Sequence, residues 1–77
     1  MPIAEHTVAA LGERALLEGY PLAGAVLLAA ETADEVRRAW RSLPPTVGVV
    51  VLTPRAAAAL GDAPRDPRSP MSVVMPS

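Results

Sequence analysis

The sequence predicts an α/β fold: one small domain, residues 1–77, with a four-stranded parallel sheet and flanking helices of the Rossmann-like or receiver-like three-layer type. Short apolar runs bounded by turn residues alternate with helical segments along the chain. The clearest run is continuous and β-branched, which is typical of a strand buried on both faces of a parallel sheet. The length leaves room for one domain, with a thin core of Ala, Val and Leu.

Four apolar runs predict the strands. They are residues 7–11, 25–30, 47–52 and 71–75. The run 47–52 follows two prolines and ends before Thr53 and Pro54, so its limits are well marked. We expect this strand to be buried, with Val49 and Val51 at the centre of the sheet.

Three segments between these runs predict helices, the first of them short, over residues 13–19. The second begins with a capping box. In this motif the Thr32 hydroxyl accepts a hydrogen bond from the amide of residue 35, and the Glu35 carboxylate accepts one from the amide of Thr32. Its apolar face is predicted from helical spacing and consists of Val36, Ala39, Trp40 and Leu43. Trp40 is expected to fill the core between helix and sheet, and Asp34 to pair with Arg38.

The third helix is predicted from Thr53 as N-cap and Pro54 at the first position, followed by an alanine-rich run. Gly61 is the expected terminator. Residues 62–70 hold three prolines and are expected to form a Pro-rich loop. Strand and helix therefore alternate to the end of the chain, which favours a parallel sheet with helices on both faces.

Composition excludes several classes of function. The formal net charge is −1, so the chain offers no strong field for nucleic acid. It has no Cys, which excludes disulfides and thiolate chemistry and favours a reducing compartment. No signal peptide or membrane-spanning run is visible. We expect a cytoplasmic protein, at most peripheral to a membrane through a complex.

The residues predict neither a catalytic centre nor a cofactor or metal site. The turn after the first strand offers one glycine, Gly12, and Glu13 places negative charge where a phosphate would bind. His6 is a lone histidine near the N-terminus, and the capping box already explains the acidic pair Asp34 and Glu35. A role without catalysis, acting through other proteins, is the interpretation that remains.

The candidate docking surface lies near the first strand–helix turn and on the second helix. It consists of Glu13, Arg14, Arg37, Arg38 and Arg41. Arginine is common at interface anchors. The three arginines of the second helix are equally well explained as a solvated helix face, and both interpretations stay open.

Several segments together resemble the F-subunit family of the V-type and A-type rotary ATPases. Residues 11–14 read Leu-Gly-Glu-Arg and residues 19–25 read Gly-Tyr-Pro-Leu-Ala-Gly-Ala, similar to a strand-ending Gly-Asp/Glu followed by Gly-Phe-Arg-Leu-Ala-Gly. Residues 32–36, 47–53 and 73–77 resemble the family's later segments in the same order. Pro21 stands where the family has Arg, and the family continues past the position of Ser77 into a C-terminal helix.

The resemblance implies a non-catalytic component of the central rotor stalk, with strand order 2-1-3-4. Such a protein binds a coiled-coil rotor protein and modulates ATP-driven rotation and proton transport. A chain without the C-terminal helix is expected to keep the docking domain and lose the regulatory contact, as a diverged relative. The alternatives are a receiver-like signalling domain or a small nucleotide-binding domain. A receiver needs an Asp at the end of its third strand, where this chain has Leu52 and Thr53.

Overall fold

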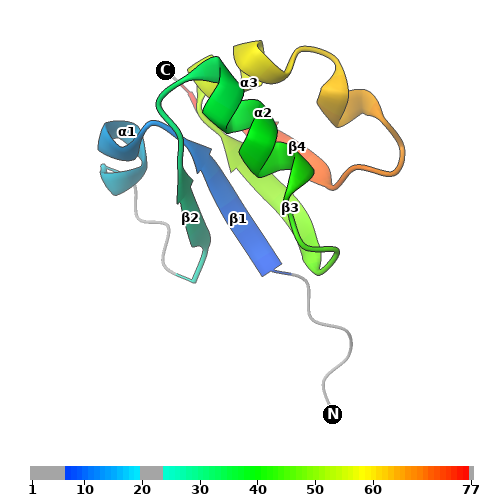
Figure 1. The fold of residues 1–77 in the computed structure, drawn as a ribbon. Coiled ribbons are helices and arrows are strands. Elements are labelled where there is room, and N and C mark those ends of the chain that lie inside the picture. Colours follow the sequence, from blue (N-terminus) through cyan, green and yellow to red (C-terminus); the bar gives the residue numbers. More distant parts are fainter. Residues whose placement is uncertain (1–6, 20–23, 77) are drawn as a thin grey trace.

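The computed structural model describes residues 7–19 and 24–76 and has the predicted α/β fold (Figure 1). The strands are β1 (Thr7–Gly12), β2 (Val26–Ala29), β3 (Val47–Leu52) and β4 (Met71–Val74). The helices are α1 (Arg14–Glu18), α2 (Ala33–Arg41) and α3 (Pro54–Leu60), with a 3₁₀ turn η1 (Ala63–Arg65) before β4. The four strands pair in parallel in the order β2-β1-β3-β4, as expected. His6, Tyr20 and Pro21 lie outside the described residues.

The main core lies between the sheet and the pair α2 and α3, which pack against each other. Alternate residues of the two central strands point into it, as the two-residue period of a strand requires. Its buried members are Ala9, Leu11, Ala30, Val36, Val47, Val50, Leu52, Ala56 and Leu60. Trp40 packs against this cluster but is only half-buried, so the prediction that it fills the core is only partly confirmed.

Among the described residues, α1 is the one helix that covers the opposite face of the sheet. This helix has only five residues and contacts β1 and β2. Its residue Leu17 and Ala10 of β1 are buried outside the main cluster. Right-handed crossovers explain the arrangement: β1 to β2 runs one way across the sheet, and the two later connections run the other way, to the other face.

Val49 and Val51 lie at the centre of the sheet, as expected, because β3 pairs with β1 on one side and β4 on the other. The prediction that β3 is buried on both faces is wrong. Val50 is the fully buried residue, at 0% exposure, while Val49 and Val51 are half-buried on the α1 side. The reason is that the five-residue helix α1 packs mainly on β1 and β2. Parallel register places five apolar side chains together on this uncovered area. We call this area the bare face and define it as Val8, Val49, Val51, Met71 and Val73.

The helix starts follow the sequence closely. Thr32 accepts a hydrogen bond from the Glu35 amide at 3.1 Å, as predicted. The Glu35 carboxylate accepts from the amide of Glu31, at 2.7 Å, so the capping box closes one residue earlier than expected. Asp34 pairs with Arg37 instead of Arg38, because residues three apart on a helix are also neighbours.

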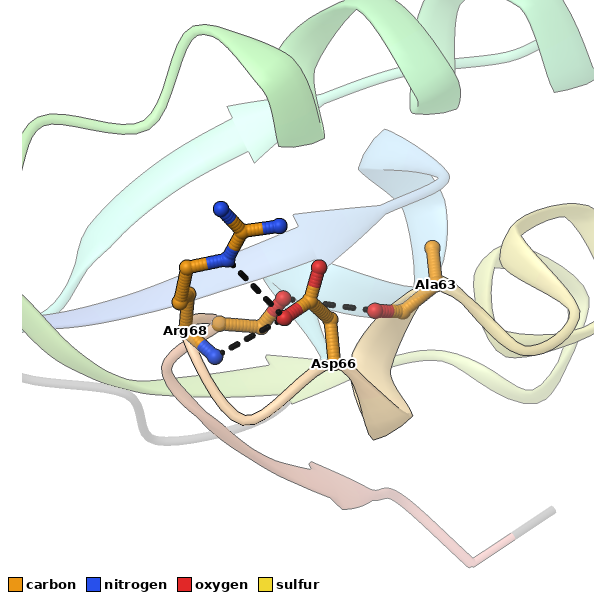
Figure 2. Close-up of polar contacts among 4 residues, drawn as sticks. Ala63, Asp66 and Arg68 are labelled. Atoms are coloured by element: carbon orange, nitrogen blue, oxygen red, sulfur yellow. Dashed lines mark hydrogen bonds and ion pairs between the residues drawn. The ribbon is translucent and has the colours of Figure 1, made fainter.

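The Pro-rich segment 62–70 contains local order that its composition did not predict. It holds the η1 turn, and the Asp66 carboxylate then accepts from the amide of Arg68 at 2.9 Å (Figure 2). That backbone hydrogen bond, with the Arg68 guanidinium, lowers the pKa of Asp66. The Ser69 hydroxyl donates to the carbonyl of Ala63 at 3.2 Å, which draws the segment back on itself.

Candidate functional site

The structure distributes the predicted docking residues over separate parts of the surface. Glu13 lines a depression at the carboxyl ends of the strands. Arg14 lines a second depression beside β2 and forms an ion pair with Glu18 at 3.8 Å. Arg37 and Arg41 line a third, which includes Leu60. The exposed Arg38 lines none of these three depressions. The predicted residues therefore do not share one depression.

The carboxyl ends of β1 and β3 meet at the contact between Gly12 and Thr53. Thr53 is completely buried, and a Cβ atom at position 12 would overlap its side chain. The Thr53 amide also donates to the carbonyl of Leu11 at 3.2 Å. Gly12 is therefore needed for close packing between two strands, which is a different use of glycine from a phosphate cradle.

Thr53 links the β3–α3 turn to the β1–α1 turn. Its hydroxyl donates to the Glu13 carboxylate at 2.5 Å and accepts from the Ala56 amide at 3.1 Å, which caps α3. The hydrogen bond from Thr53 lowers the pKa of Glu13; partial burial opposes this shift and the positive charge of Arg55 adds to it. Glu13 is therefore a charged structural link across the top of the sheet.

The depression at this edge has a volume of about 490 Å³ and combines polar and apolar walls. Glu13, Glu31, Thr32 and Arg55 supply its polar side chains. The Glu31 carboxylate accepts from the amide of Arg14 at 3.0 Å, at the start of α1. The amide that a bound phosphate would use is thus occupied by a carboxylate of the chain itself. Within residues 7–19 and 24–76, no three His, Asp or Glu side chains come together as metal ligands.

The link between Thr53 and Glu13 predicts a pH-dependent part of the stability. Because the folded chain lowers the pKa of Glu13 below 4.5, the stabilisation is complete above the unfolded pKa. It is lost as the pH falls through the folded pKa. Replacing Thr53 by Val should cost about 1–2 kcal/mol through the lost helix cap. It should also reduce the loss of stability with acidification below pH 4.5.

Urea unfolding at a series of pH values from neutral down through the folded pKa of Glu13 measures both effects. Thr53→Ser is the matched control, because it keeps the hydroxyl and should keep the acid dependence. Glu13→Gln should remove the same pH-dependent part while leaving the Ala56 amide capped. If the free energy of unfolding falls equally with acidification in wild type, Thr53→Val and Glu13→Gln, the Glu13 carboxylate is not coupled to folding.

The bare face is the second candidate site, and it is the one that sequence reasoning missed. Its outer residues are strongly exposed for apolar side chains: Met71 at 68%, Val73 at 48% and Val8 at 39%. No ionisable side chain belongs to it. Apolar patches of this kind on a single chain are often sites of association. The available signal was the pair of neighbouring apolar residues Val73 and Val74, which lie on opposite faces of a strand.

The helix α1 borders the bare face with an apolar side chain. Leu17 points to the sheet, and Arg14 and Glu18 lie on the β2 side, where they share a depression with Leu27. At 100° per residue, Leu16 lies on the other flank of the helix, toward β3. Leu16 is 37% exposed. The bare face therefore has an apolar floor and an apolar side wall.

No protein-family model, curated protein or solved structure matches this chain significantly. None of the helices in the described ranges has both the length and the apolar character needed to cross a bilayer.

Proposed function

We propose that this chain is a non-catalytic docking protein that binds another protein through the bare face. The observation that carries the proposal is a parallel sheet with one half-uncovered face. Sheets of this kind are normally covered on both sides, since their strands are apolar on both. Here two helices cover one face and a five-residue helix covers part of the other. A partner that covers β3 and β4 would complete the missing layer.

The occupant that fits this surface is an amphipathic helix of a partner protein. A helix placed beside α1 continues the layer that α1 begins, at the spacing of helices packed on a sheet. It would rest on Val51 and Val73 and contact Leu16 with its flank. Because the bare face is uncharged, the contacting side of that helix must also be apolar. A coiled-coil protein offers such a helix, with charged residues restricted to its outer positions.

The resemblance to the F-subunit family gives this partner a specific identity: the coiled-coil rotor protein of a V-type or A-type ATPase. In that setting the chain would bind the central stalk and modulate ATP-driven rotation and proton transport. Residues 11–14 and 47–53, which carry part of the resemblance, form the first strand end and the third strand. The receiver-like and nucleotide-binding alternatives gain no support from the carboxyl-edge depression, where carboxylates occupy the anion position.

The test combines two substitutions on the bare face, Met71→Lys and Val73→Lys. Both side chains are already exposed in the isolated chain, so the double variant should keep the wild-type circular dichroism spectrum and melting temperature. Its affinity for the coiled-coil stalk protein of the same organism should fall by about tenfold or more, because two charges are desolvated against an apolar helix. Titration calorimetry measures the affinity.

Ala58→Lys is the matched control, since it adds a charge at an exposed position of α3, on the far side of the sheet. It should bind like wild type. Wild-type binding that survives the double substitution would refute the bare face as the docking site. Failure of the wild type to bind the stalk protein would refute the rotor assignment. Sedimentation of the isolated chain as a dimer, dissociated by the double variant, would show that a second copy is the occupant.

A further inference from the structure

A groove beside Trp40 lies on the side of the molecule that carries α2, away from the bare face. Two depressions, of about 540 Å³ and 180 Å³, share Trp40 and Arg41 in their walls. The larger extends to Pro44, Pro45 and Pro70, and the smaller extends to Leu60 and Ala63. Trp40 and Arg41 therefore border both depressions, which are lined by residues of α2 and of the segment 62–70. We call the two depressions together the Trp40 groove.

The groove combines an apolar floor with positive charge. Leu43 and Val47 line it beside the indole, and Leu60 lines its far end. Three arginines border it: Arg37, Arg41 and Arg68. No Asp or Glu of the described residues lines either depression. All the charged side chains that line the groove are therefore positive.

The three arginines differ in whether they already form an ion pair within the chain. Arg37 pairs with Asp34, and Arg68 contacts Asp66 at 3.5 Å with a highly exposed guanidinium. Arg41 has no ion pair within the part of the chain that the structure describes, and it lines both depressions. It is the side chain best placed to bind a carboxylate from outside, next to the indole.

We propose that the Trp40 groove binds an extended acidic peptide, with an apolar or prolyl side chain beside Trp40 and a carboxylate on Arg41. Aromatic grooves flanked by prolines suit extended, polyproline-like segments, which lose little entropy on binding. Pro44, Pro45 and Pro70 have no amide hydrogen, so recognition here rests on packing and charge more than on backbone pairing. The arginines select acidic residues over basic ones.

A nucleic acid is the competing ligand, because arginine and an indole can also bind phosphate and base. The groove favours the peptide: it has one aromatic side chain and aliphatic walls, whereas single-stranded nucleic acid needs several stacking surfaces and a basic field. The chain as a whole has a net charge of −1. The lining of this site includes none of the residues of the bare face, so its test does not depend on the proposed function.

Trp40 is the single tryptophan of the chain, so its fluorescence reports directly on the groove. The probe is the capped peptide Glu-Pro-Leu-Pro-Glu-Pro-Leu-Pro-Glu, titrated into the full chain. We expect a saturable blue shift of the emission as the peptide excludes water from the indole. The same peptide with Lys in place of Glu, and a short oligothymidine, serve as comparison ligands and should bind at least about tenfold more weakly.

Arg41→Glu should weaken binding of the acidic peptide by about tenfold or more. Arg41→Lys should recover part of the loss, since it keeps the charge without the planar fork. Arg38→Glu is the matched control: it is an exposed arginine on the same helix, outside both depressions, and should change affinity by less than about twofold.

Three results would each overturn the proposal. They are no change in Trp40 emission at millimolar acidic peptide, equal losses for Arg38→Glu and Arg41→Glu, and tighter binding of the oligonucleotide than of the peptide. Circular dichroism of each variant confirms that the fold is kept.

Discussion

Replacing Val50 by Asp is expected to abolish cooperative folding. Val50 is 0% exposed, lies in the central strand β3 and belongs to the main core cluster. A carboxylate there has no partner, so the substitution either buries an unpaired charge or forces protonation, at a cost of several kcal/mol. A domain of this size has a total stability of about 4–10 kcal/mol. The destabilisation by Val50→Asp is therefore comparable with the total stability of the domain.

Thermal and urea unfolding followed by circular dichroism measure this effect. The wild type should give one sigmoidal transition, and Val50→Asp should give none. Ala58→Asp is the control, because it introduces the same group at an exposed position of α3. A Val50→Asp variant with an unchanged melting curve would mean that β3 does not lie in the core.

Replacing Gly12 by Ala is expected to cost about 3 kcal/mol, which is a large effect for one methyl group. The added Cβ atom would overlap the side chain of Thr53, and Thr53 cannot easily move. It is completely buried, and its hydroxyl holds Glu13 and the Ala56 amide in place. The clash therefore separates β1 from the start of α3 or breaks the helix cap.

A double-mutant cycle tests the cause directly. Thr53→Ala alone should cost about 2 kcal/mol, through the lost cap and the lost packing of a buried methyl group. In the Gly12→Ala, Thr53→Ala double variant, the combined cost should be less than the sum of the two single costs, because the smaller side chain relieves part of the overlap. Gly19→Ala is the control: the added Cβ would meet only backbone oxygens at 3.6 Å and 3.8 Å. Strict additivity at positions 12 and 53 would contradict this explanation.

Local signals in the sequence were sufficient for the elements and for the fold class. Prolines and a threonine bound the β-branched run 47–52, and the observed strand has the same limits. The N-caps Thr32 and Thr53 were predicted and are confirmed by hydrogen bonds to the third residue of each helix. Strand limits and helix caps depend on residues only a few positions apart in the chain, so they can be predicted from a single sequence. Regular alternation of strands and helices then leaves few topologies.

The candidate sites depended on contacts between segments that lie far apart in the chain. The link from Thr53 to Glu13 spans 40 residues, and neither residue by itself predicts it. The Trp40 groove forms because segment 62–70 comes to lie beside the end of α2. The sequence singled out the arginines of α2, but it could not separate Arg41, which lines the groove, from Arg38, which does not.

The sequence by itself determined which residues form strands and helices, where the helices begin, and that the sheet is parallel. Only the tertiary structure decided which apolar residues are covered. Val49, Val50 and Val51 are chemically identical neighbours, yet only Val50 is fully buried. The physical reason is that burial depends on what packs above each face of the sheet. Two helices lie above one face, whereas α1 is too short to cover β3 and β4 on the other.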